Sequence, residues 1–599
     1  MNDVLTLLFS QQFLIRALVV GVLISLCSAL LGVSLVLKRF SMIGDGLSHV
    51  AFGAMAIATA ASVAPLYFAL PIVVVAAFLL LRMSESGKIK GDAAIALIST
   101  GSLAVGVLAT SMTTGMNVDI YNYMFGSILT MSKADVLTSG IIALIIITLF
   151  AVFYNEIFAV TFDESFAKAT GTKVGVYNML IAALTAVTIV IGMRMMGALL
   201  ISSLIIFPTV TSMRLCKSFR SVVLSSVIIS VFCFVSGLLL SIRIEAPTGA
   251  SVVVMNIFML ICFTLLKAVS QIPENSRASH FRLPLKALII ILCAVSYLAA
   301  FSSGGAHIRE NKEKPVIVAT AFAEYDFARQ IAGDKAEAVM LLSPGEESHT
   351  YEPTPGDIMK INQSDVFIYG GGESDKWADS ILSSVDSDIH IIKMMDTVEL
   401  YEESTVDGME SDHEHHDHGH VHSEEYDEHV WTSPLNAIAI CDTICEALCE
   451  ADGQNAEYYK ANLKRYTEEI KKLDEEILYF TQNAANNHIV IGDRFPLRYF
   501  TERYNLDYYA AFPGCSAQVE ANPATVSNLS NKVKDEGIPV VFKVDLSKGE
   551  IAYTISEMTG AQVETLYSCH VISADDFEQG ETYISLMRRN FDALKKALQ

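Results

Sequence analysis

The stretch QNAEYYKANLKRYTEEIKKLDEEILYFTQNA, residues 454–484, decides how the second half of the chain folds. Its large apolar side chains recur every three or four residues, which is the spacing of one face of an α-helix. Most residues between them are charged, so the opposite face suits water. We therefore expect one long amphipathic helix whose seam is formed by Leu463, Tyr466, Ile470, Leu473, Ile477 and Phe480.

Short apolar runs typical of buried strands lie on both sides of this helix. Strands that alternate with helices favour parallel sheets. Residues 306–599 are therefore predicted to form an α/β domain with two lobes that flank one long linking helix. The runs are PVIVATAFA at 315–323, VFIY at 366–369, HIVI at 488–491 and PVVF at 539–542.

A polar segment ahead of the long helix, Asp412–His429, reads DHEHHDHGHVHSEEYDEH and holds seven of the chain's 14 histidines. Neutral imidazole is a common ligand of zinc and late first-row metals. The segment has no apolar period, so we expect a mobile, metal-collecting loop at residues 411–424. A solvated charge run without a role is the plain alternative.

Composition divides the chain into two halves. Hydrophobic residues make up 52% of the sequence, yet the formal net charge is −23. Residues 1–301 are apolar, whereas residues 306–599 are polar and acidic. An acidic half argues against nucleic acid as a partner and suits a cation.

Apolar stretches of membrane-spanning length recur in the first half. Every second stretch is followed by basic residues; Lys38 and Arg39, for example, follow the first one. The positive-inside rule assigns these basic loops to the cytoplasm. We expect a multi-pass protein of the cell membrane, with the N-terminus and residues 306–599 outside the cytoplasm. The expected spans are 13–37, 47–63, 65–82, 92–112, 135–154, 174–194, 197–214, 221–241, 247–267 and 284–301.

Two polar features interrupt this apolar half. Asp45 and His49 lie four residues apart, so they share one helix face. Ionisable groups inside a membrane bundle usually mark an ion path, although a polar pair at the interface is the alternative. Residues 162–171, FDESFAKATG, predict a short amphipathic helix that Gly171 closes.

These features resemble the permease subunit of metal-cation ABC importers of the zinc, manganese and iron class. The resemblance covers most of residues 10–268 and implies that Asp45 and His49 line the metal route. It also implies that residues 162–171 dock into a cytoplasmic ATPase subunit and that two copies of the permease pair. The further matching stretches are MIGDGLSH at 42–49, FGSIL at 125–129 and GALLISSLIIFP at 197–208.

The ATPase is expected to be a separate subunit. The sequence contains no G-x-x-x-x-G-K-[ST] phosphate loop, so we predict that this chain is not an enzyme. Residues 1–268 are then the permease domain. Residues 269–305 are an extra membrane anchor with a short linker, and cleavage near 299–304 is the alternative.

Residues 314–599 resemble the extracytoplasmic solute-binding proteins of the same importers. The resemblance implies that His349 and His429 are the first two metal ligands. A His-rich loop before the second ligand is the pattern of zinc-type members. The stretches that carry the match include GEESH at 345–349, EPTP at 352–355, DEHVW at 427–431 and YF at 499–500.

The sequence departs from this pattern at the remaining ligands. Asp493 stands where most members have a histidine, and an ion pair with Arg494 or Arg498 is its alternative role. The usual Asp-Pro segment reads LYSCH at 566–570, which makes His570 a candidate. Asp545 occupies roughly the place of a glutamate in many members.

Two alternative roles stay open for Cys515 and Cys569, which lie outside the membrane half. Cys515 and Cys569 could form a disulfide in an oxidising compartment, or Cys569 could bind metal as a thiolate. Cys441, Cys445 and Cys449 follow each other at four-residue steps, which favours packing on one helix face.

The sequence therefore predicts a fused permease and binding protein of an ABC importer for a divalent metal cation, with zinc as the cargo. Manganese and iron remain alternatives. A membrane-anchored metal sensor or buffer is the competing class. A zinc hydrolase would need a helical HExxH, and the histidine run does not supply one.

Overall fold

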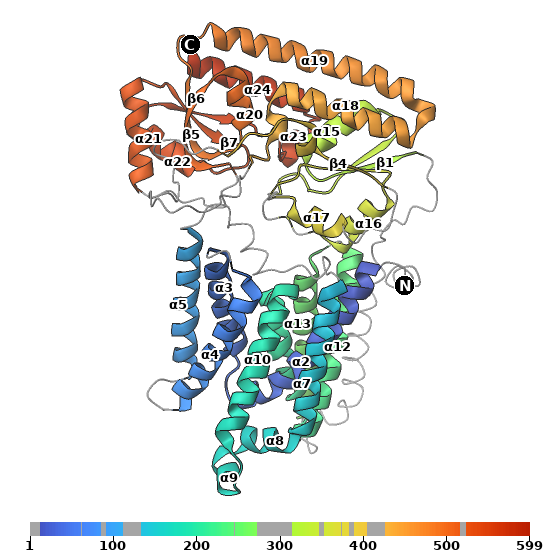
Figure 1. The fold of residues 1–599 in the computed structure, drawn as a ribbon, viewed down its shortest axis with the longest axis vertical. Coiled ribbons are helices and arrows are strands. Elements are labelled where there is room, and N and C mark those ends of the chain that lie inside the picture. Colours follow the sequence, from blue (N-terminus) through green and yellow to red (C-terminus); the bar gives the residue numbers. More distant parts are fainter. Residues whose placement is uncertain are drawn as a thin grey trace. The chain divides into compact units, whose positions relative to one another are not determined.

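The computed structural model describes residues 12–60, 63–85, 91–111, 133–244, 246–271, 314–346, 351, 353–372, 374–382, 389–403, 426–514 and 523–599. The chain divides into two compact units, one built mainly from residues 1–308 and the other from most of residues 309–599. The first unit is helical, and the second contains parallel sheets covered by helices (Figure 1). These architectures confirm the predicted fold class.

The helices of the first unit follow the apolar stretches of the sequence. Within the described residues, α2, α7, α10, α12 and α13 are long and apolar enough to cross a membrane, and the apolar parts of α3, α4, α5 and α11 are shorter. The last expected span, residues 284–301, lies outside the described residues. The bounds are α2 (Gln12–Leu37), α3 (Ile43–Ala60), α4 (Pro65–Glu85), α5 (Gly91–Ser111), α7 (Lys133–Val152), α10 (Val174–Met196), α11 (Ala198–Ser212), α12 (Phe219–Ile244) and α13 (Thr248–Ser270).

Glycines allow these helices to approach one another closely. A Cβ atom on Gly32 of α2 would lie 2.2 Å from the carbonyl oxygen of Ile205 in α11. A Cβ atom on Gly53 of α3 would lie 2.4 Å from the carbonyl oxygen of Ser102 in α5. Between helices in a membrane there is no hydrophobic driving force, so association depends on close packing. Small residues at such crossings let the backbones pack tightly.

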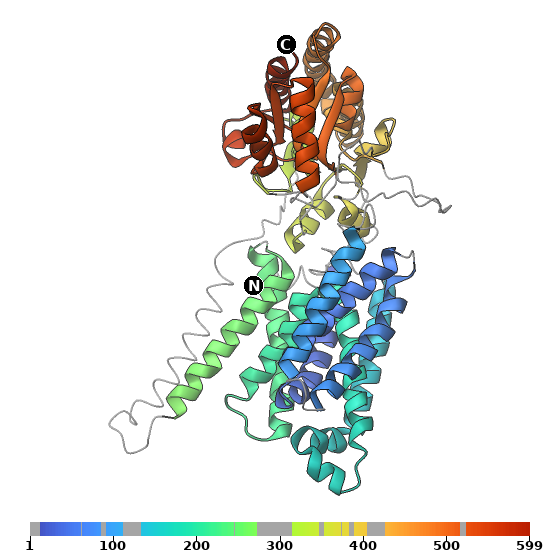
Figure 2. The ribbon, with the colours of Figure 1, turned by 90° about the vertical axis from the view of Figure 1, so that its left-hand side faces the viewer.

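Two short helices, α8 (Tyr154–Phe162) and α9 (Glu164–Ala169), lie at one end of the bundle (Figure 2). The Asp163 carboxylate begins α9 by accepting a 2.9 Å hydrogen bond from the Phe166 backbone nitrogen. Gly171, with φ of +90°, follows its end. This confirms the short helix predicted at residues 162–171. The side chains of Phe162, at the end of α8, and Phe166, in α9, are exposed, so this end of the bundle presents apolar surface.

The second unit is built on two four-stranded sheets, ordered β2-β1-β3-β4 and β6-β5-β7-β8, with every pair of neighbours parallel. Parallel strands gather the loops after their carboxyl ends at one edge of each sheet. The strands are β1 (Val316–Ala319), β2 (Glu337–Met340), β3 (Val366–Tyr369), β4 (His390–Lys393), β5 (His488–Phe495), β6 (Asp507–Pro513), β7 (Val540–Val544) and β8 (Gln562–Leu566).

The long helix α19 (Ala456–Gln482) joins the two lobes, as the sequence predicts. It contacts α15 (Phe322–Ala332) in the first lobe and both α20 (Arg498–Tyr504) and α24 (Tyr583–Leu598) in the second. Four seam residues are fully buried, and Leu463 and Phe480 pack partly buried against the same core. The four are Tyr466, Ile470, Leu473 and Ile477.

A second long helix, α18 (Pro434–Ala451), lies along α19 (Figure 1). Cys441 and Cys445 are buried in the core that the two helices share, and Cys449 packs partly buried against it. This agrees with the predicted packing role of these cysteines. The remaining helices of the unit are α16 (Pro355–Gln363), α17 (Lys376–Leu382), α21 (Pro523–Glu536), α22 (Glu550–Thr559) and α23 (Ala574–Glu578).

Candidate metal centre

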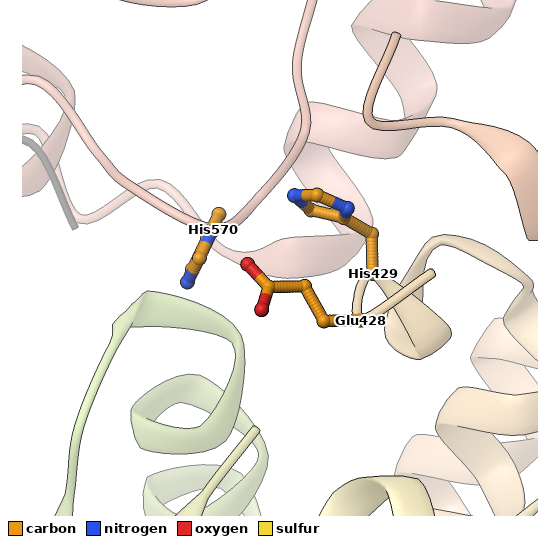
Figure 3. A group of neighbouring side chains, drawn as sticks. All are labelled: Glu428, His429 and His570. Atoms are coloured by element: carbon orange, nitrogen blue, oxygen red, sulfur yellow. The ribbon is translucent and has the colours of Figure 1, made fainter. Parts of the chain in front are cut away.

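Three buried side chains that could hold a metal ion converge in the second unit: Glu428, His429 and His570. One ligand atom from each lies within 4.8 Å of those of the other two. Figure 3 shows the Glu428 carboxylate turned toward the space between the two imidazoles. Glu428 and His429 come just before a short 3-10 helix, Val430–Thr432, and His570 follows β8. Two imidazoles and one carboxylate form a donor set that suits zinc and other first-row metals.

The Asp427 carboxylate orients His429. Its Oδ1 accepts a 2.8 Å hydrogen bond from the His429 backbone nitrogen and lies 3.1 Å from His429 Nδ1. A carboxylate at Nδ1 selects the tautomer with the proton there, which leaves Nε2 as the metal-binding atom. Burial works to lower the pKa of His429, but the charges of Asp427 and Glu428 outweigh it, so the pKa is raised. Because ligation needs the deprotonated nitrogen, this shift strengthens the competition between protons and a metal ion.

Backbone hydrogen bonds hold the His570 loop. The Phe322 nitrogen donates to the His570 carbonyl oxygen at 3.1 Å, and the Gly345 nitrogen donates to Ile572 at 2.7 Å. The ring of Trp431 lies 4.8 Å from the His570 ring, between centroids, and 5.6 Å from that of His429. The two imidazoles therefore pack against the same indole ring.

The structure places Asp545 behind this loop rather than in the group of three. Its Oδ1 accepts a 3.0 Å hydrogen bond from the Ser568 nitrogen, and its Oδ2 lies 3.2 Å from the Ser568 hydroxyl. That hydroxyl oxygen in turn accepts a 3.2 Å bond from the His570 nitrogen. Asp545 therefore supports the backbone that carries His570.

Cys569 is buried next to His570 but is also absent from the group of three. Its backbone has a positive φ of 58°, an unusual conformation for a residue other than glycine. Burial, followed by the charge of Asp545, raises the pKa of the thiol well above its usual value. That shift disfavours a thiolate. Cys515 lies outside the described residues, so the disulfide stays a prediction.

Asp493 lies in β5 at a register irregularity between Ile491 and Arg494. Its Oδ1 accepts a 2.9 Å hydrogen bond from the Arg494 nitrogen. Its Oδ2 is buried and has no hydrogen-bond partner within the described part of the chain. Arg498, one of its expected partners, pairs with Glu502 at 2.6 Å. Asp493 does not join the group of three, yet its second oxygen retains the capacity to bind a cation.

Of the five predicted outer-domain ligands, the structure brings His429 and His570 together. His349 and residues 411–424 lie outside the described residues, so their roles stay predictions. Glu428 was not expected. The only signal for it was its position directly before His429, because its contribution depends on the fold around it.

Glu428 is held by a turn before α17. The Ser374 nitrogen donates a 3.0 Å hydrogen bond to its carboxylate, and the Ser374 hydroxyl donates a second one. Burial, as the leading cause, raises the pKa of Glu428. The carboxylate is thus fixed in place, and a neighbouring cation would favour its charged form.

Two further buried acids lie behind Glu428. Asp375 Oδ2 accepts hydrogen bonds from the backbone nitrogens of Gly370 and Gly371, at 2.8 and 3.3 Å. Burial, then the charge of Glu428, raise the pKa of Asp375 to about 7. Burial, then the charge of Asp375, raise the pKa of Glu324 to about 8. A divalent cation at the group of three would favour the ionised forms of these acids.

The pair predicted for the membrane half lies in the first turns of α3. His49 Nε2 is 3.8 Å from Asp45 Oδ2, and the two side chains are 23% and 49% exposed. They share one helix face, as their spacing requires. Their part in a metal route stays a prediction.

The two halves of the chain match two different families. Residues 10–267 match the ABC 3 transport family, and residues 317–597 match the family described as zinc-uptake complex component A, periplasmic. The second half is similar to the zinc-binding lipoprotein AdcA of Streptococcus pneumoniae, strain R6. The two are 28% identical over 320 residues, which cover 52% of this chain and 60% of AdcA. This chain thus spans about three fifths of the length of that relative.

The second half is also similar to the high-affinity zinc uptake system protein ZnuA of Bacillus subtilis. The identity is 29% over 313 residues, covering 52% of this chain and 96% of ZnuA. Among solved structures, the Zn(II)-bound ZnuA-like domain of S. pneumoniae AdcA aligns with a TM-score of 0.40 and 27% identity. That alignment covers 48% of this chain and 99% of the domain.

Proposed function

We propose that this chain, which joins a region of the ABC 3 transport family to a region of the zinc-uptake component A family, forms the permease and metal-binding parts of one importer. The importer is of the ABC type, and its cargo is a divalent metal cation, with zinc favoured. One observation carries the proposal: the buried group of Glu428, His429 and His570 belongs to a chain that also contains membrane-length apolar helices.

The group of three is the core of the proposed binding site. His429 and His570 supply nitrogen, Glu428 supplies oxygen, and His349 is the expected further ligand. Imidazole-rich sites suit zinc, and the two relatives of this half are named as a zinc-binding lipoprotein and a zinc uptake system protein. Manganese or iron is the alternative, because the spare oxygen of Asp493 offers harder ligation.

Capture of the metal is coupled to the charges of the site. The charges of Asp427 and Glu428 favour the protonated imidazole of His429, whereas metal ligation needs the deprotonated one, so protons compete with the metal there. Glu428 and the acids behind it offset the charge of the cation. The His-rich loop at 411–424 serves as an accessory collector, because its polar sequence without an apolar period is not expected to form a selective site.

The captured ion passes to the membrane half. Asp45 and His49 form a transfer station with two protein ligands, which is weak enough to release the ion inward. In this arrangement residues 306–599 face the outside of the cell membrane. A separate ATPase docks at residues 162–171, where the end of α8 exposes Phe162 and α9 exposes Phe166. Two copies of the permease domain pair around the route.

Uptake of radioactive zinc tests the proposal. The full chain is expressed, with and without its ATPase partner, in cells that lack their own zinc importers. Zinc accumulation that needs both proteins supports the importer. A metal sensor or buffer would bind zinc without raising cellular accumulation. Competition by manganese and iron in the same assay identifies the cargo.

A further inference from the structure

Helix α9 is tied to the rest of the first unit through Glu164. Glu164 Oε1 accepts a 2.7 Å hydrogen bond from Lys38 Nζ and a 3.2 Å bond from Asn178 Nδ2. Lys38 Nζ also donates to Asn178 Oδ1. These three side chains, here called the Lys38 triad, connect the end of α2, the start of α9 and the first turns of α10.

The burial of the triad is uneven. The Lys38 side chain is 8% exposed and Asn178 is 5% exposed, whereas the Glu164 side chain is 44% exposed. A buried ammonium group is costly unless a carboxylate compensates its charge. Because that carboxylate stands on α9, displacement of α9 would leave the Lys38 charge uncompensated. Lys38 and α9 are therefore expected to move together.

A short connection joins Lys38 to the helix that carries the proposed metal station. Helix α2 ends at Leu37 and α3 begins at Ile43, so a five-residue turn leads from Lys38 into the helix that carries Asp45. This turn is tight: the Phe40 nitrogen donates to the Leu35 carbonyl at 2.8 Å, and the Ile43 nitrogen donates to Phe40 at 3.0 Å. Arg39 within it has a left-handed φ of 64°. A short, hydrogen-bonded turn transmits a displacement of Lys38 to α3 better than a long loop without such bonds would.

We propose that the Lys38 triad couples the ATPase-docking helix α9 to the metal station at the start of α3. The inference rests on the proposed function, since it assigns α9 to the ATPase and Asp45 to the metal route. Glu164, Lys38 and Asn178 are positioning residues that touch neither ATP nor metal. Displacement of α9 by the ATPase pulls on Lys38, and Lys38 shifts the first turn of α3.

Charge exchange across the pair tests the coupling. Full-length Lys38→Glu, Glu164→Lys and the double exchange are expressed with the ATPase partner, and membrane vesicles are assayed for zinc uptake and ATP hydrolysis. Asn178 can serve the reversed pair, because its amide both donates and accepts. Arg39→Met is the matched control: it removes a neighbouring positive charge whose side chain is exposed.

Each single variant is expected to lower zinc uptake by about tenfold, the scale of an ordinary coupling between two sites, while hydrolysis continues. The double exchange should restore most of the uptake, and Arg39→Met should leave it unchanged. Uptake at the wild-type rate in either single variant overturns the proposal. So does a double exchange that transports no better than the singles.

Two further measurements cover failures of folding or of function. If a single variant does not reach the membrane, the neutral pair Lys38→Met with Glu164→Gln leaves no buried charge alone. Low uptake with continued hydrolysis then supports the coupling, and wild-type uptake overturns it.

If the wild-type chain does not transport zinc, the proposed function fails. Hydrogen exchange then decides: Glu164→Lys must speed exchange in both 164–170 and 43–49, and a change confined to 164–170 overturns the proposal.

Discussion

The indole Nε1 of Trp431 donates a 2.9 Å hydrogen bond to the carbonyl oxygen of Ser568. Trp431 lies two residues after His429, and Ser568 lies two residues before His570. The bond therefore joins the two segments that carry the imidazoles of the candidate metal centre. Both residues are buried, so this bond fixes the spacing of the two segments away from water.

Removal of either imidazole should weaken zinc binding sharply. His429→Ala and His570→Ala are each expected to raise the zinc Kd of the chain by more than about 100-fold, since even supporting residues outside the ligand set change affinity 10–100-fold. The sequence-based assignment predicts the same for His349→Ala. Titration calorimetry measures the Kd. His390→Ala, a histidine on β4 with a 40% exposed side chain, is the control and should bind as wild type.

The Asp427 carboxylate should set the pH range of binding. Asp427→Asn keeps the size of the side chain but removes the charge that raises the pKa of His429. Zinc affinity should fall by about 10–100-fold at neutral pH, because the favoured tautomer is lost. Proton competition should then begin at a lower pH than in wild type. An unchanged Kd and pH profile would show that Asp427 does not act through His429.

The Glu324 carboxyl should make the metal-free protein less stable as pH rises. Its pKa is raised from 4.5 to about 8 in the fold, so the folded state holds a proton that the unfolded state releases. The stabilisation from this proton is full below the unfolded pKa and is lost as pH rises through about 8.

Glu324→Gln should therefore remove a fall in unfolding free energy of about 1–4 kcal/mol between pH 5 and pH 8. Denaturant unfolding in the presence of a chelator measures the fall. Glu475→Gln, which changes an exposed acid on α19, is the control and should keep the wild-type slope. Asp375 contributes a fall of its own, so the slope should decrease rather than vanish, and an unchanged slope in Glu324→Gln would contradict the prediction.

The His-rich loop should be dispensable for the tight site. Deletion of residues 411–424 is expected to leave one high-affinity zinc site per chain and to remove weaker sites, because a polar run without an apolar period is not expected to form a selective site. Equilibrium dialysis over a wide zinc range counts both classes. Loss of the high-affinity site on deletion would place its ligands within the loop.

The pair in α3 should be needed for transport but not for capture. Asp45→Asn and His49→Ala are each expected to abolish zinc uptake, since a two-ligand station cannot lose one ligand and still hold a cation. Zinc binding by residues 306–599 should remain at the wild-type Kd. Wild-type uptake at normal membrane levels would reduce the pair to a polar cluster at the membrane surface.

Local pattern predicted several of the main elements of this protein. The seam from Leu463 to Phe480 predicted α19, the run at 366–369 predicted β3, and the apolar stretches of the first half predicted its long helices. The spacing of apolar residues along one helix or strand predicts which of its sides will be buried. This spacing depends only on residues that are close together in the sequence. The motif at 427–431 likewise placed His429 among the candidate ligands without any knowledge of the fold.

The arrangement of the candidate site was decided by tertiary structure alone. Sequence placed Asp545 beside His570 as an equal candidate, but the parallel order of β7 and β8 puts Asp545 behind Ser568. Glu428 joined the two imidazoles because Ser374, from a distant turn, holds its carboxylate. Such distances depend on sheet register and on how loops from different strands meet, and no spacing along the chain encodes them.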